Sequence, residues 1–402
     1  MGSKKKTIMI FGAGINQLEL IREAKGLHIT TVAIDPSDSP PGKKEADHYY
    51  QVKGNDYETT RGIALKHKID GIVTGQMEKP LRLMAKLATE LGLIFHSEAV
   101  IEKSLNKWLM KQAFLKDRIP CASGVILKKD QELTKEALNE LSFPVIIKPV
   151  DAFSSRGVYK ADSVDELKAC RNDSINYASD GNVIIEEFLA GKEFSIESIT
   201  FEGKTEIVQF TEKFITPYPN TVEMGHLQPA NLNDTEREQI SKLIRKAIIA
   251  MGIDYSASHA EIILTNDGPK MVEIGARLGG DFIASYLTKA STGISMDKAA
   301  VQIALGKKPD LVKTENVFSY IKYFHLPEGA RIKSATIPDE LKAMEGMVFS
   351  AVFGQPGDII PQLNHSAQRT GCILVKADSR ERVIKLAEKY EDILTQNIQF
   401  IM

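Results

Sequence analysis

The chain has 402 residues, enough for two or three domains with a substantial buried core. Hydrophobic residues make up 43% and charged residues 26% of it, a globular composition that excludes a disordered tail protein and a small disulfide scaffold. The 51 Lys and Arg residues against 53 Asp and Glu residues give a formal net charge of -2. We therefore expect no basic surface for general nucleic-acid binding.

The cysteines and the lack of a long apolar segment predict a cytoplasmic protein. Cys121, Cys170 and Cys372 lie far apart without metal-binding or redox spacing, so we interpret them as reduced thiols. No run of eighteen apolar residues exists, and the basic start at 1–6 lacks a signal-peptide core. We expect no membrane partner.

The first hundred residues alternate between strand and helix patterns. Apolar runs predict strands over 7–11, 29–34 and 71–74, and helical spacing predicts helices over 17–24 and 81–91. This alternation is typical of βαβ units and predicts a parallel sheet.

The loop after the first strand partly matches a dinucleotide-binding fingerprint. Gly12 and Gly14 follow the strand, and Asp35 closes the second strand about twenty residues later. Gln17 stands where the third glycine of the motif would allow close helix-to-strand packing. We favour a structural turn and keep an NAD-type oxidoreductase as an alternative.

A second α/β region begins near residue 104. Its predicted helices cover 104–116, 133–141, 164–169 and 234–250, and its predicted strands cover 125–127, 145–149, 183–186 and 194–200. Residues 151–157 form a polar turn of the kind that contacts anions. The last ninety residues repeat such signals more weakly, ending in a strand over 371–376 and a helix over 380–393.

Two carboxylates are predicted to meet across a β-hairpin. A three-residue loop at 266–268, with Gly268 at positive φ, would place Glu261 opposite Glu273. Facing side chains lie roughly 4.5–5.5 Å apart, so the two carboxylates would repel each other unless a cation lay between them. A two-residue turn would shift the register by one and separate the glutamates onto opposite faces.

The same register assigns the neighbouring side chains to faces. It places His259 and Met271 beside the two glutamates, and it directs Val272 and Ile274 into the core. Two convergent carboxylates near Arg277 suit Mg²⁺, which prefers oxygen ligands and is often completed by substrate phosphates. A solvated charged face is the alternative interpretation.

Together these residues resemble the ATP-grasp superfamily, in particular carboxylate-amine ligases such as biotin carboxylase, carbamoyl phosphate synthetase and, most closely, the L-amino acid ligases. The resemblance covers essentially the whole chain. It rests on Asn106, Lys107, Lys111, Lys148, Pro149, residues 151–157, 186–189 and 191–195, Glu261, Glu273, Arg277, Gly279 and Gly280.

The resemblance implies an α/β fold, α+β overall. An N-terminal pre-ATP-grasp domain with a parallel βαβ sheet would cover 1–103, and a two-lobed nucleotide-binding region would cover 104–310. Its lobes would meet near residue 186, with lobe A at about 104–186 and lobe B at about 187–310. A C-terminal α+β domain would cover 311–402.

The resemblance also implies the phosphate-binding residues. Lys107 and Lys148 would contact the α and β phosphates of ATP, and Ser154, Ser155 and Gly157 would close over them. An unpaired buried ammonium is costly, so Lys148, in an apolar strand, needs an anionic partner. The alternatives are a surface lysine at 107 and ordinary turn residues in the loop.

The adenosine contacts follow from the same resemblance. Glu186, Glu187 and Leu189 match the hinge between two ATP-binding lobes, where backbone groups and the first glutamate meet the adenine amine. Glu193 matches the residue that accepts hydrogen bonds from the ribose hydroxyls. Taken without the family, Glu186 and Glu187 would be an exposed strand end.

One departure concerns the metal. The family commonly has Asn two residues after the second metal glutamate, whereas this chain has Gly275 after Glu273. Glycine offers no side-chain oxygen, so Glu261 and Glu273 would hold one or two Mg²⁺ ions, with Mn²⁺ as a substitute.

Two further residues are implied in catalysis. Arg277 would lie beside the transferred phosphoryl group and stabilise its developing charge, unless it forms only a structural salt bridge. His226 matches a Gly-His of amino acid ligases near the acceptor site, although a loop histidine is often only a surface group. His259 shares a face with Glu261 and would hydrogen-bond a metal ligand or be satisfied in the core.

The implied activity is an ADP-forming ligation of a carboxylate, expected to be an amino acid, to an amine through an acyl phosphate, with ATP and Mg²⁺. Its partners would be small-molecule carboxylate and amine substrates, and a homodimer through the first domain stays open. The alternatives are an ATP-grasp ligase for a purine-pathway, formyl or bicarbonate substrate, the oxidoreductase above, and a non-catalytic ATP-binding module.

Overall fold

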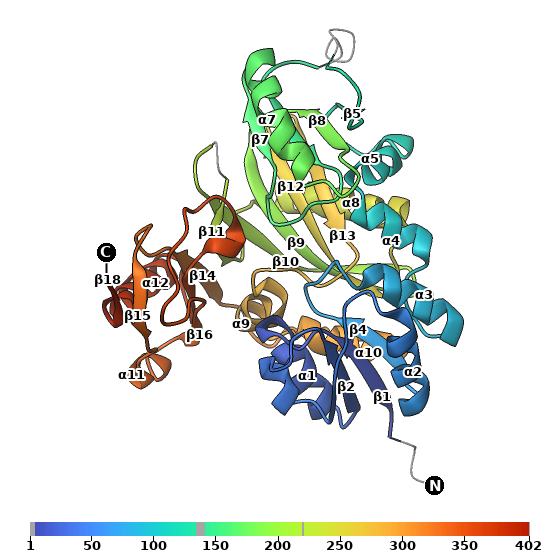
Figure 1. The fold of residues 1–402 in the computed structure, drawn as a ribbon, viewed down its shortest axis with the longest axis vertical. Helices are drawn as coiled ribbons and strands as arrows, with labels where there is room; N and C mark the ends of the chain where they lie inside the picture. Colours follow the sequence, from blue (N-terminus) through green and yellow to red (C-terminus); the bar gives the residue numbers. More distant parts are fainter. Residues whose placement is uncertain (1–4, 134–140, 219–220, 402) are drawn as a thin grey trace.

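The computed structural model describes residues 5–133, 141–218 and 221–401, and the bounds and contacts below refer to these residues. Figure 1 shows an N-terminal layer in blue, a long central sheet in green and yellow, and a red C-terminal layer beside it. This mixed α/β architecture, with parallel strands in its N-terminal part, confirms the predicted fold class. No described helix is long and apolar enough to cross a bilayer.

The N-terminal sheet contains four parallel strands in the order β3-β2-β1-β4. Its strands are β1 (Thr7–Phe11), β2 (Thr30–Asp35), β3 (His48–Gln51) and β4 (Gly71–Thr74). Three helices lie beside them, α1 (Leu18–Gly26), α2 (Tyr57–His67) and α3 (Leu81–Leu91). The predicted strands over 7–11 and 71–74 and the predicted helix over 81–91 are confirmed, as is the parallel arrangement.

The glycine turn after β1 is filled by protein side chains. The carboxamide of Gln17 accepts a hydrogen bond from Gly14 N at 3.1 Å and donates one to Gly75 O at 2.7 Å. Asp35 accepts hydrogen bonds from Ala13 N and Ser37 N, both at 2.8 Å. These contacts give the turn a packing role, as favoured above, rather than the role of a dinucleotide site.

The predicted single helix over 104–116 is wrong. The structure has two helices, α4 (Glu98–Leu105) and α5 (Lys107–Lys116), separated at Asn106, whose backbone is extended with φ -121° and ψ 109°. The Asn106 side chain accepts hydrogen bonds from the backbone N–H groups of Trp108 and Leu109. It therefore caps the second helix, a role typical of asparagine.

A small antiparallel sheet follows the N-terminal part of the chain. Its strands lie in the order β5-β8-β6-β7. They are β5 (Gly124–Leu127), β6 (Val145–Pro149), β7 (Tyr159–Ala161) and β8 (Val183–Glu187), with helix α7 (Val164–Asn176) packed against β6 and β7. The helix predicted over 133–141 lies largely outside the described residues.

The central sheet has eight strands in the order β13-β12-β9-β10-β11-β14-β17-β16. Its first five strands are β9 (Lys192–Phe201), β10 (Lys204–Ile215), β11 (Glu223–Gln228), β12 (Ser256–Thr265) and β13 (Gly268–Gly275). Helix α8 (Asp234–Met251) packs against β13 and shares a buried core with it, which includes Ile244, Ile248, Ile262 and Ile274. This core fixes the strands that carry the two glutamates.

C-terminal strands extend the same sheet. They are β14 (Phe318–Phe324), β16 (Met347–Val352) and β17 (Gly371–Ala377), and α12 (Arg380–Gln396) packs on β14 and β17. A two-stranded sheet, β15 (Arg331–Ala335) with β18 (Ile398–Ile401), and α11 (Asp339–Lys342) complete this part, while α9 (Thr288–Thr292) and α10 (Met296–Ala304) precede it. The domain boundaries given above stay a prediction.

The hairpin between β12 and β13 has the predicted strand pairing, but its turn and its register differ from the prediction. Thr265 pairs with Gly268, so the turn has two residues and the predicted three-residue loop is wrong. A β-bulge then shifts the register between Glu261 and Ile262 and leaves Val272 unpaired. Beyond the bulge Glu261 pairs with Glu273, as predicted.

The bulge also changes which side chains reach the core. Met271 is only 2% exposed and belongs to the core with Ile274, whereas Val272 is partly exposed and lines a cavity. The predicted core position of Val272 is therefore wrong, whereas Met271 joins the core and also lines that cavity together with Glu273. A bulge reverses the alternation of side chains, and the sequence pattern gave no sign of one.

Candidate active site

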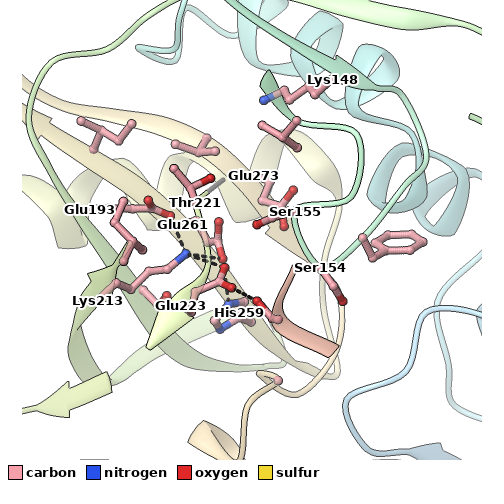
Figure 2. A pocket seen from close by; sticks show the side chains of 18 of the residues that line it. Lys148, Ser154, Ser155, Glu193, Lys213, Thr221, Glu223, His259, Glu261 and Glu273 are labelled. Carbon is pink, nitrogen blue, oxygen red and sulfur yellow. Dashed lines mark hydrogen bonds and ion pairs between the residues drawn. The ribbon is translucent and has the colours of Figure 1, made fainter. Parts of the chain in front are cut away.

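A cleft of about 350 Å³ lies between the small sheet, the central sheet and the loop after β4. It is lined by twelve of the thirteen predicted site residues, Lys107, Lys148, Ser154, Ser155, Glu186, Glu187, Leu189, Glu193, His226, Glu261, Glu273 and Arg277. Figure 2 shows Glu261 and Glu273 at its centre, with Lys148 above them and Ser154 and Ser155 to one side. We call this space the main cleft.

The facing carboxylates of Glu261 and Glu273 are each held by cations. Glu273 lies 3.3 Å from the ammonium of Lys107, at the start of α5, and this lysine also donates to Ala152 O at 2.8 Å. Glu261 lies 3.0 Å from the ammonium of Lys213. Because each of the two acids has a cationic partner, their mutual repulsion is offset.

Lys213 is the buried centre of a cluster drawn from four adjacent strands. Its ammonium contacts Glu193 on β9, Glu261 on β12 at 3.0 Å and Glu223 on β11 at 3.7 Å, as the dashed lines in Figure 2 show. Burial alone would lower the pKa of Lys213, but the three carboxylates outweigh it and hold that pKa well above its ordinary value. Lys213 therefore stays protonated and positively charged at neutral pH.

His259 lies behind Glu261 on β12. Its Nδ1 is 2.5 Å from Oε1 of Glu197, a fully buried residue of β9, and its Nε2 is 3.6 Å from Glu261. Burial opposes the charged imidazolium, yet the Glu197 carboxylate raises the pKa of His259 to about 9. His259 therefore lies beside Glu261, a candidate metal ligand, as predicted. Glu197 is the partner that orients its ring.

Glu186 bridges two buried lysines. Its carboxylate lies 2.8 Å from Lys111 on α5 and 2.6 Å from Lys148 on β6. Burial alone would lower the pKa of Lys148, but Glu186 outweighs that effect and raises it. Two cations against one carboxylate leave an excess of positive charge beside the cleft, which suits a phosphate.

Glu187, the last residue of β8, and Leu189, two residues later, line the main cleft, and Glu193 lines it at the start of β9. They follow one another from the small sheet to the central sheet, so this segment connects the two sheets. Burial raises the pKa of Glu193, although the adjacent Lys213 opposes this. The arrangement suits the hinge and ribose contacts that were expected of them.

The loop after β6 contains a run of left-handed backbone. Ser154 and Ser155 have φ of 61° and 57°, and Gly157 has φ of 73°. Non-glycine residues in this conformation cost on the order of 1–3 kcal/mol each and cluster at ligand-binding sites. Gly157 lines a neighbouring cavity and not the main cleft. A Cβ there would lie 2.9 Å from Pro149 and Tyr177, so the close packing of this loop excludes a side chain.

Arg277 follows β13 and points to the N-terminal domain. Both Nε and Nη2 donate to Oε1 of Glu78, which lies in the loop after β4, and Nη1 donates to Leu278 O at 2.7 Å. Burial alone would lower its pKa, but Glu78 outweighs burial and raises it. Arg277 is thus a fixed cation at the wall of the main cleft. It forms the structural salt bridge considered in the sequence analysis, and its partner is Glu78 rather than Glu261 or Glu273.

His226 on β11 contacts Asp281, whose own partner comes from the C-terminal part of the chain. His226 Nε2 lies 3.0 Å from Asp281, and Arg369 forms a two-armed salt bridge to that aspartate at 2.6 and 2.8 Å. His226 is only 2% exposed. It is therefore not the surface group of the alternative interpretation.

Sequence reasoning missed six residues of this site, Glu78, Glu197, Lys213, Glu223, Asp281 and Arg369. One signal was available for Lys213. On β10 it alternates with Thr211 and Gln209, both buried, so this face of the strand carries a polar stripe in a buried sheet. The other five meet the site only through tertiary contacts.

The residues fit a nucleotide with a divalent ion. In the described part of the chain, no group of three or more His, Cys, Asp or Glu residues could hold a metal unaided. The Glu261 and Glu273 carboxylates would therefore hold Mg²⁺ together with phosphate oxygens, which is its usual mode of binding. Lys107 and Lys148 lie on the same wall and provide the positive charge that such phosphates need.

Comparisons with known proteins agree with this geometry. Residues 141–285 match the ATP-grasp domain, and residues 322–395 match the L-amino acid ligase C-terminal domain 2. Alanine--anticapsin ligase of Bacillus subtilis is 28% identical over 280 residues, which cover 62% of this chain and 57% of that protein. The chain thus spans little more than half of that relative.

Two further proteins are similar over most of their length. Dapdiamide A synthase of Enterobacter agglomerans is 25% identical over 83% of this chain and 81% of its own. The crystal structure of L-amino acid ligase from Bacillus licheniformis superimposes with a TM-score of 0.84, at 22% sequence identity, and covers 99% of both chains. The structural similarity confirms the expected fold, and the match of residues 141–285 to the ATP-grasp domain agrees with the suspected superfamily.

Proposed function

We propose that this chain, which contains an ATP-grasp domain followed by an L-amino acid ligase C-terminal domain 2, is an ADP-forming ligase that joins a carboxylate to an amine. The carboxylate is expected to be an amino acid. The observation that carries the proposal is the opposition of Glu261 and Glu273 in a cleft that also contains Arg277 and the lysine pair around Glu186.

The chemistry follows from the substrates. A carboxylate at neutral pH is a poor electrophile, whereas its acyl phosphate has a leaving group. The carboxylate attacks the γ phosphate of ATP, ADP leaves, and the amine then displaces phosphate. Enclosure of the acyl phosphate keeps water from hydrolysing it.

Each proposed site residue has a physical task. Lys107 and Lys148 bind the phosphates, Ser154, Ser155 and Gly157 close over them, and Glu186, Glu187, Leu189 and Glu193 contact the adenosine. Glu261 and Glu273 are metal ligands, and bound Mg²⁺ would offset the charge that develops on the phosphates. Arg277 adds a fixed cation for the transferred phosphoryl group, and His226 lies beside the acceptor.

Glu78 explains how Arg277 keeps its place. The carboxylate comes from the N-terminal domain, so this ion pair ties the loop after β4 to the loop after β13. A guanidinium fixed before the reaction needs no reorganisation in the transition state. We propose that Glu78 positions Arg277.

A panel of amino acids and small carboxylates, incubated with ATP and Mg²⁺, tests the function. Phosphate release should depend on one class of carboxylate, and added hydroxylamine should trap the acyl phosphate as a hydroxamate. Phosphate release that does not depend on any carboxylate would contradict the ligase and favour a simple ATPase. ATP binding without turnover would favour the non-catalytic module.

A further inference from the structure

Asp281 places a carboxylate on the wall of the main cleft, in the loop that follows β13. Its side chain is 27% exposed, whereas the side chains of its partners Arg369 and His226 are 7% and 2% exposed. The carboxylate is thus the accessible part of a group whose other members are buried. Arg277, the cation proposed for the transferred phosphoryl group, lies on the same loop and also lines the cleft.

Several contacts hold Asp281 in an unusual backbone conformation. Asp281 and Phe282 have φ of 53° and 59°, in the left-handed region that non-glycine residues rarely adopt. The Tyr323 hydroxyl donates to Asp281 O at 2.9 Å, and the Tyr323 ring centre lies 3.6 Å from the Arg369 guanidinium. Residues held in this way cluster at ligand-binding sites. A salt bridge that only joined two parts of the chain would not need this backbone geometry.

The carboxylate of Asp281 can accept one more hydrogen bond. An ionised carboxylate offers about four acceptor positions, two on each oxygen. In the described part of the chain, Oδ2 accepts from Arg369 at 2.8 Å and from His226 Nε2 at 3.0 Å, whereas Oδ1 accepts only from Arg369, at 2.6 Å. Burial alone would raise the pKa of Asp281, but Arg369 and His226 outweigh it and hold that pKa well below its usual range. The carboxylate is therefore charged at neutral pH, and Oδ1 can bind a donor in the cleft.

His226 provides a second acceptor beside Asp281. Because a charged carboxylate only accepts hydrogen bonds, Nε2 of His226 must carry the hydrogen of the bond between them. In the neutral ring Nδ1 is then an acceptor, and it is buried without a hydrogen-bond partner among residues 5–133, 141–218 and 221–401. The ring also lines the main cleft. Both side chains therefore favour a ligand with N–H donors over an anion.

The two ends of the main cleft differ in charge. The buried lysine pair described above gives one end an excess of positive charge, which suits phosphates. Figure 2 shows Lys148 on one side of Glu261 and Glu223 on the other. Glu223 and Asp281 both line the cleft and contact the same buried guanidinium, so they lie at the same end. Glu223 is 3.7 Å from Lys213, which lies closer to two other carboxylates, so its charge is only partly offset. This end favours a cation.

We propose that Asp281 binds the ammonium group of the amine substrate and places its nitrogen beside the acyl phosphate. A primary ammonium has three N–H donors, one of which Oδ1 of Asp281 accepts. Arg369 does not line the main cleft and is a positioning residue that holds this carboxylate. The assignment rests on the proposed ligase function, and it requires only a positive charge of the amine.

The reaction balances without a further reactant. The nitrogen loses a proton, attacks the acyl carbon and forms the C–N bond, while the C–O bond to phosphate breaks and phosphate leaves with the electron pair. The ammonium loses two protons in all, one to solvent and one that leaves with phosphate. Asp281 orients the nitrogen and stays ionised throughout.

Hydroxylamine is an internal reference, because it is uncharged at about pH 8 and should not need Asp281. The cationic probes are ethylamine, ethanolamine and the common amino acids, each with ATP, Mg²⁺ and the carboxylate that yields most hydroxamate. The measured quantity is kcat/KM for the best of these amines divided by kcat/KM for hydroxylamine. Asp281→Asn should lower this ratio about tenfold or more through a higher KM for the amine, as expected for loss of a hydrogen bond between charged groups.

A double variant separates binding from structural damage. Asp281→Asn leaves the buried guanidinium of Arg369 without a charged partner, whereas Asp281→Asn combined with Arg369→Gln removes both charges. The double variant should show the same fall in the ratio, and continued hydroxamate formation shows that it is folded. Asp339→Asn is the matched control, because its side chain is 94% exposed, pairs with Lys342 on α11 and lies outside the cleft. It should leave the ratio unchanged.

Four results would overturn the assignment. If the reactions with the amine and with hydroxylamine fall equally in Asp281→Asn, or if neither falls, Asp281 has only a structural role. If the ratio recovers in the double variant, the unpaired Arg369 caused the effect. If the wild type uses hydroxylamine but none of the cationic amines, the cleft accepts no ammonium. In these cases the ligase proposal stands, whereas a wild type that forms no hydroxamate with any carboxylate contradicts both proposals.

Discussion

The ammonium of Lys213 lies 3.0 Å from Oε1 of Glu261, so a buried cation two strands away in the sheet holds one of the two opposed carboxylates. The Lys213 side chain is 3% exposed, whereas Glu193, Glu223 and Glu261 are 23%, 16% and 19% exposed. The carboxylates thus retain some access to the cleft and the lysine has almost none. The cluster fixes the geometry of this part of the cleft.

Lys213→Met should destabilise the protein strongly. Removing one partner of a buried ion cluster costs about 3–5 kcal/mol, because the remaining carboxylates are left buried and repel one another. Urea unfolding at neutral pH measures the change in free energy. Lys242→Met is the control, since its ion pair with Glu238 is exposed and worth about 0–1 kcal/mol. Equal, small losses in both variants would show that the buried cluster adds little to stability.

The hairpin between β12 and β13 shows most clearly how much of the site can be predicted from the sequence. Strand alternation and the turn signal at Gly268 predicted that Glu261 faces Glu273, and they face each other. The predicted loop length was wrong, and the bulge at Val272 compensated for it. Turn residues report local backbone geometry, whereas a bulge depends on how the strand packs against α8 and the neighbouring strands, which a local pattern does not contain.

The cations around the carboxylates show a second limit. Lys107 and Lys148 were predicted from a family resemblance, and both line the main cleft. Glu78 was missed because its partner lies far away in the sequence, and Lys213 was missed because its three carboxylate partners lie on other strands of the sheet. Glu78 and Arg277 are separated by 199 positions, and their contact arises only when the N-terminal sheet docks on the central one. The sequence determines such a contact, but no local pattern of residues indicates it.

Glu273→Gln should abolish magnesium-dependent turnover and leave the fold intact. The amide keeps the size of the side chain but loses the negative charge that a divalent ion needs. The rate of ADP release with ATP, Mg²⁺ and an active carboxylate measures the effect, and circular dichroism reports the fold. Glu206→Gln, at an exposed position on β10, should behave like wild type. ADP release at the normal rate from Glu273→Gln would remove this glutamate from the metal site.

Gly275→Asn should add a metal ligand beside Glu273. The three atoms nearest to a Cβ at this position belong to the Arg277 side chain and lie at 3.5–3.6 Å, which is an ordinary van der Waals distance. The amide oxygen should therefore fit and should hold a second ion more tightly. Mn²⁺ titration with a non-hydrolysable ATP analogue, followed by electron paramagnetic resonance, should show more bound Mn²⁺ per chain than in wild type.

Gly275→Ala controls for the loss of backbone freedom, because it adds a Cβ without an oxygen. It should bind the same amount of Mn²⁺ as wild type. If Gly275→Asn also binds no additional Mn²⁺, position 275 does not face the ion.

Asp297, on α10, is a buried acid that does not line the main cleft. It is 1% exposed, and neither carboxylate oxygen has a hydrogen-bond partner in the described part of the chain. Burial raises its pKa to about 8, and the nearby Glu19 and Glu23 carboxylates act in the same direction, while Lys289 opposes them. The folded protein therefore keeps this proton at a pH at which the unfolded chain has lost it.

Stability should consequently fall as the pH rises. The contribution of Asp297 is fully present below the ordinary aspartate pKa near 4 and is lost as the pH rises to about 8. At about 1.36 kcal/mol per pKa unit this amounts to roughly 5 kcal/mol. Asp297→Asn, which cannot ionise, should match wild type in urea unfolding at pH 4.5 and exceed it at pH 8. A difference between the two proteins that does not change with pH would show that Asp297 ionises normally in the folded state.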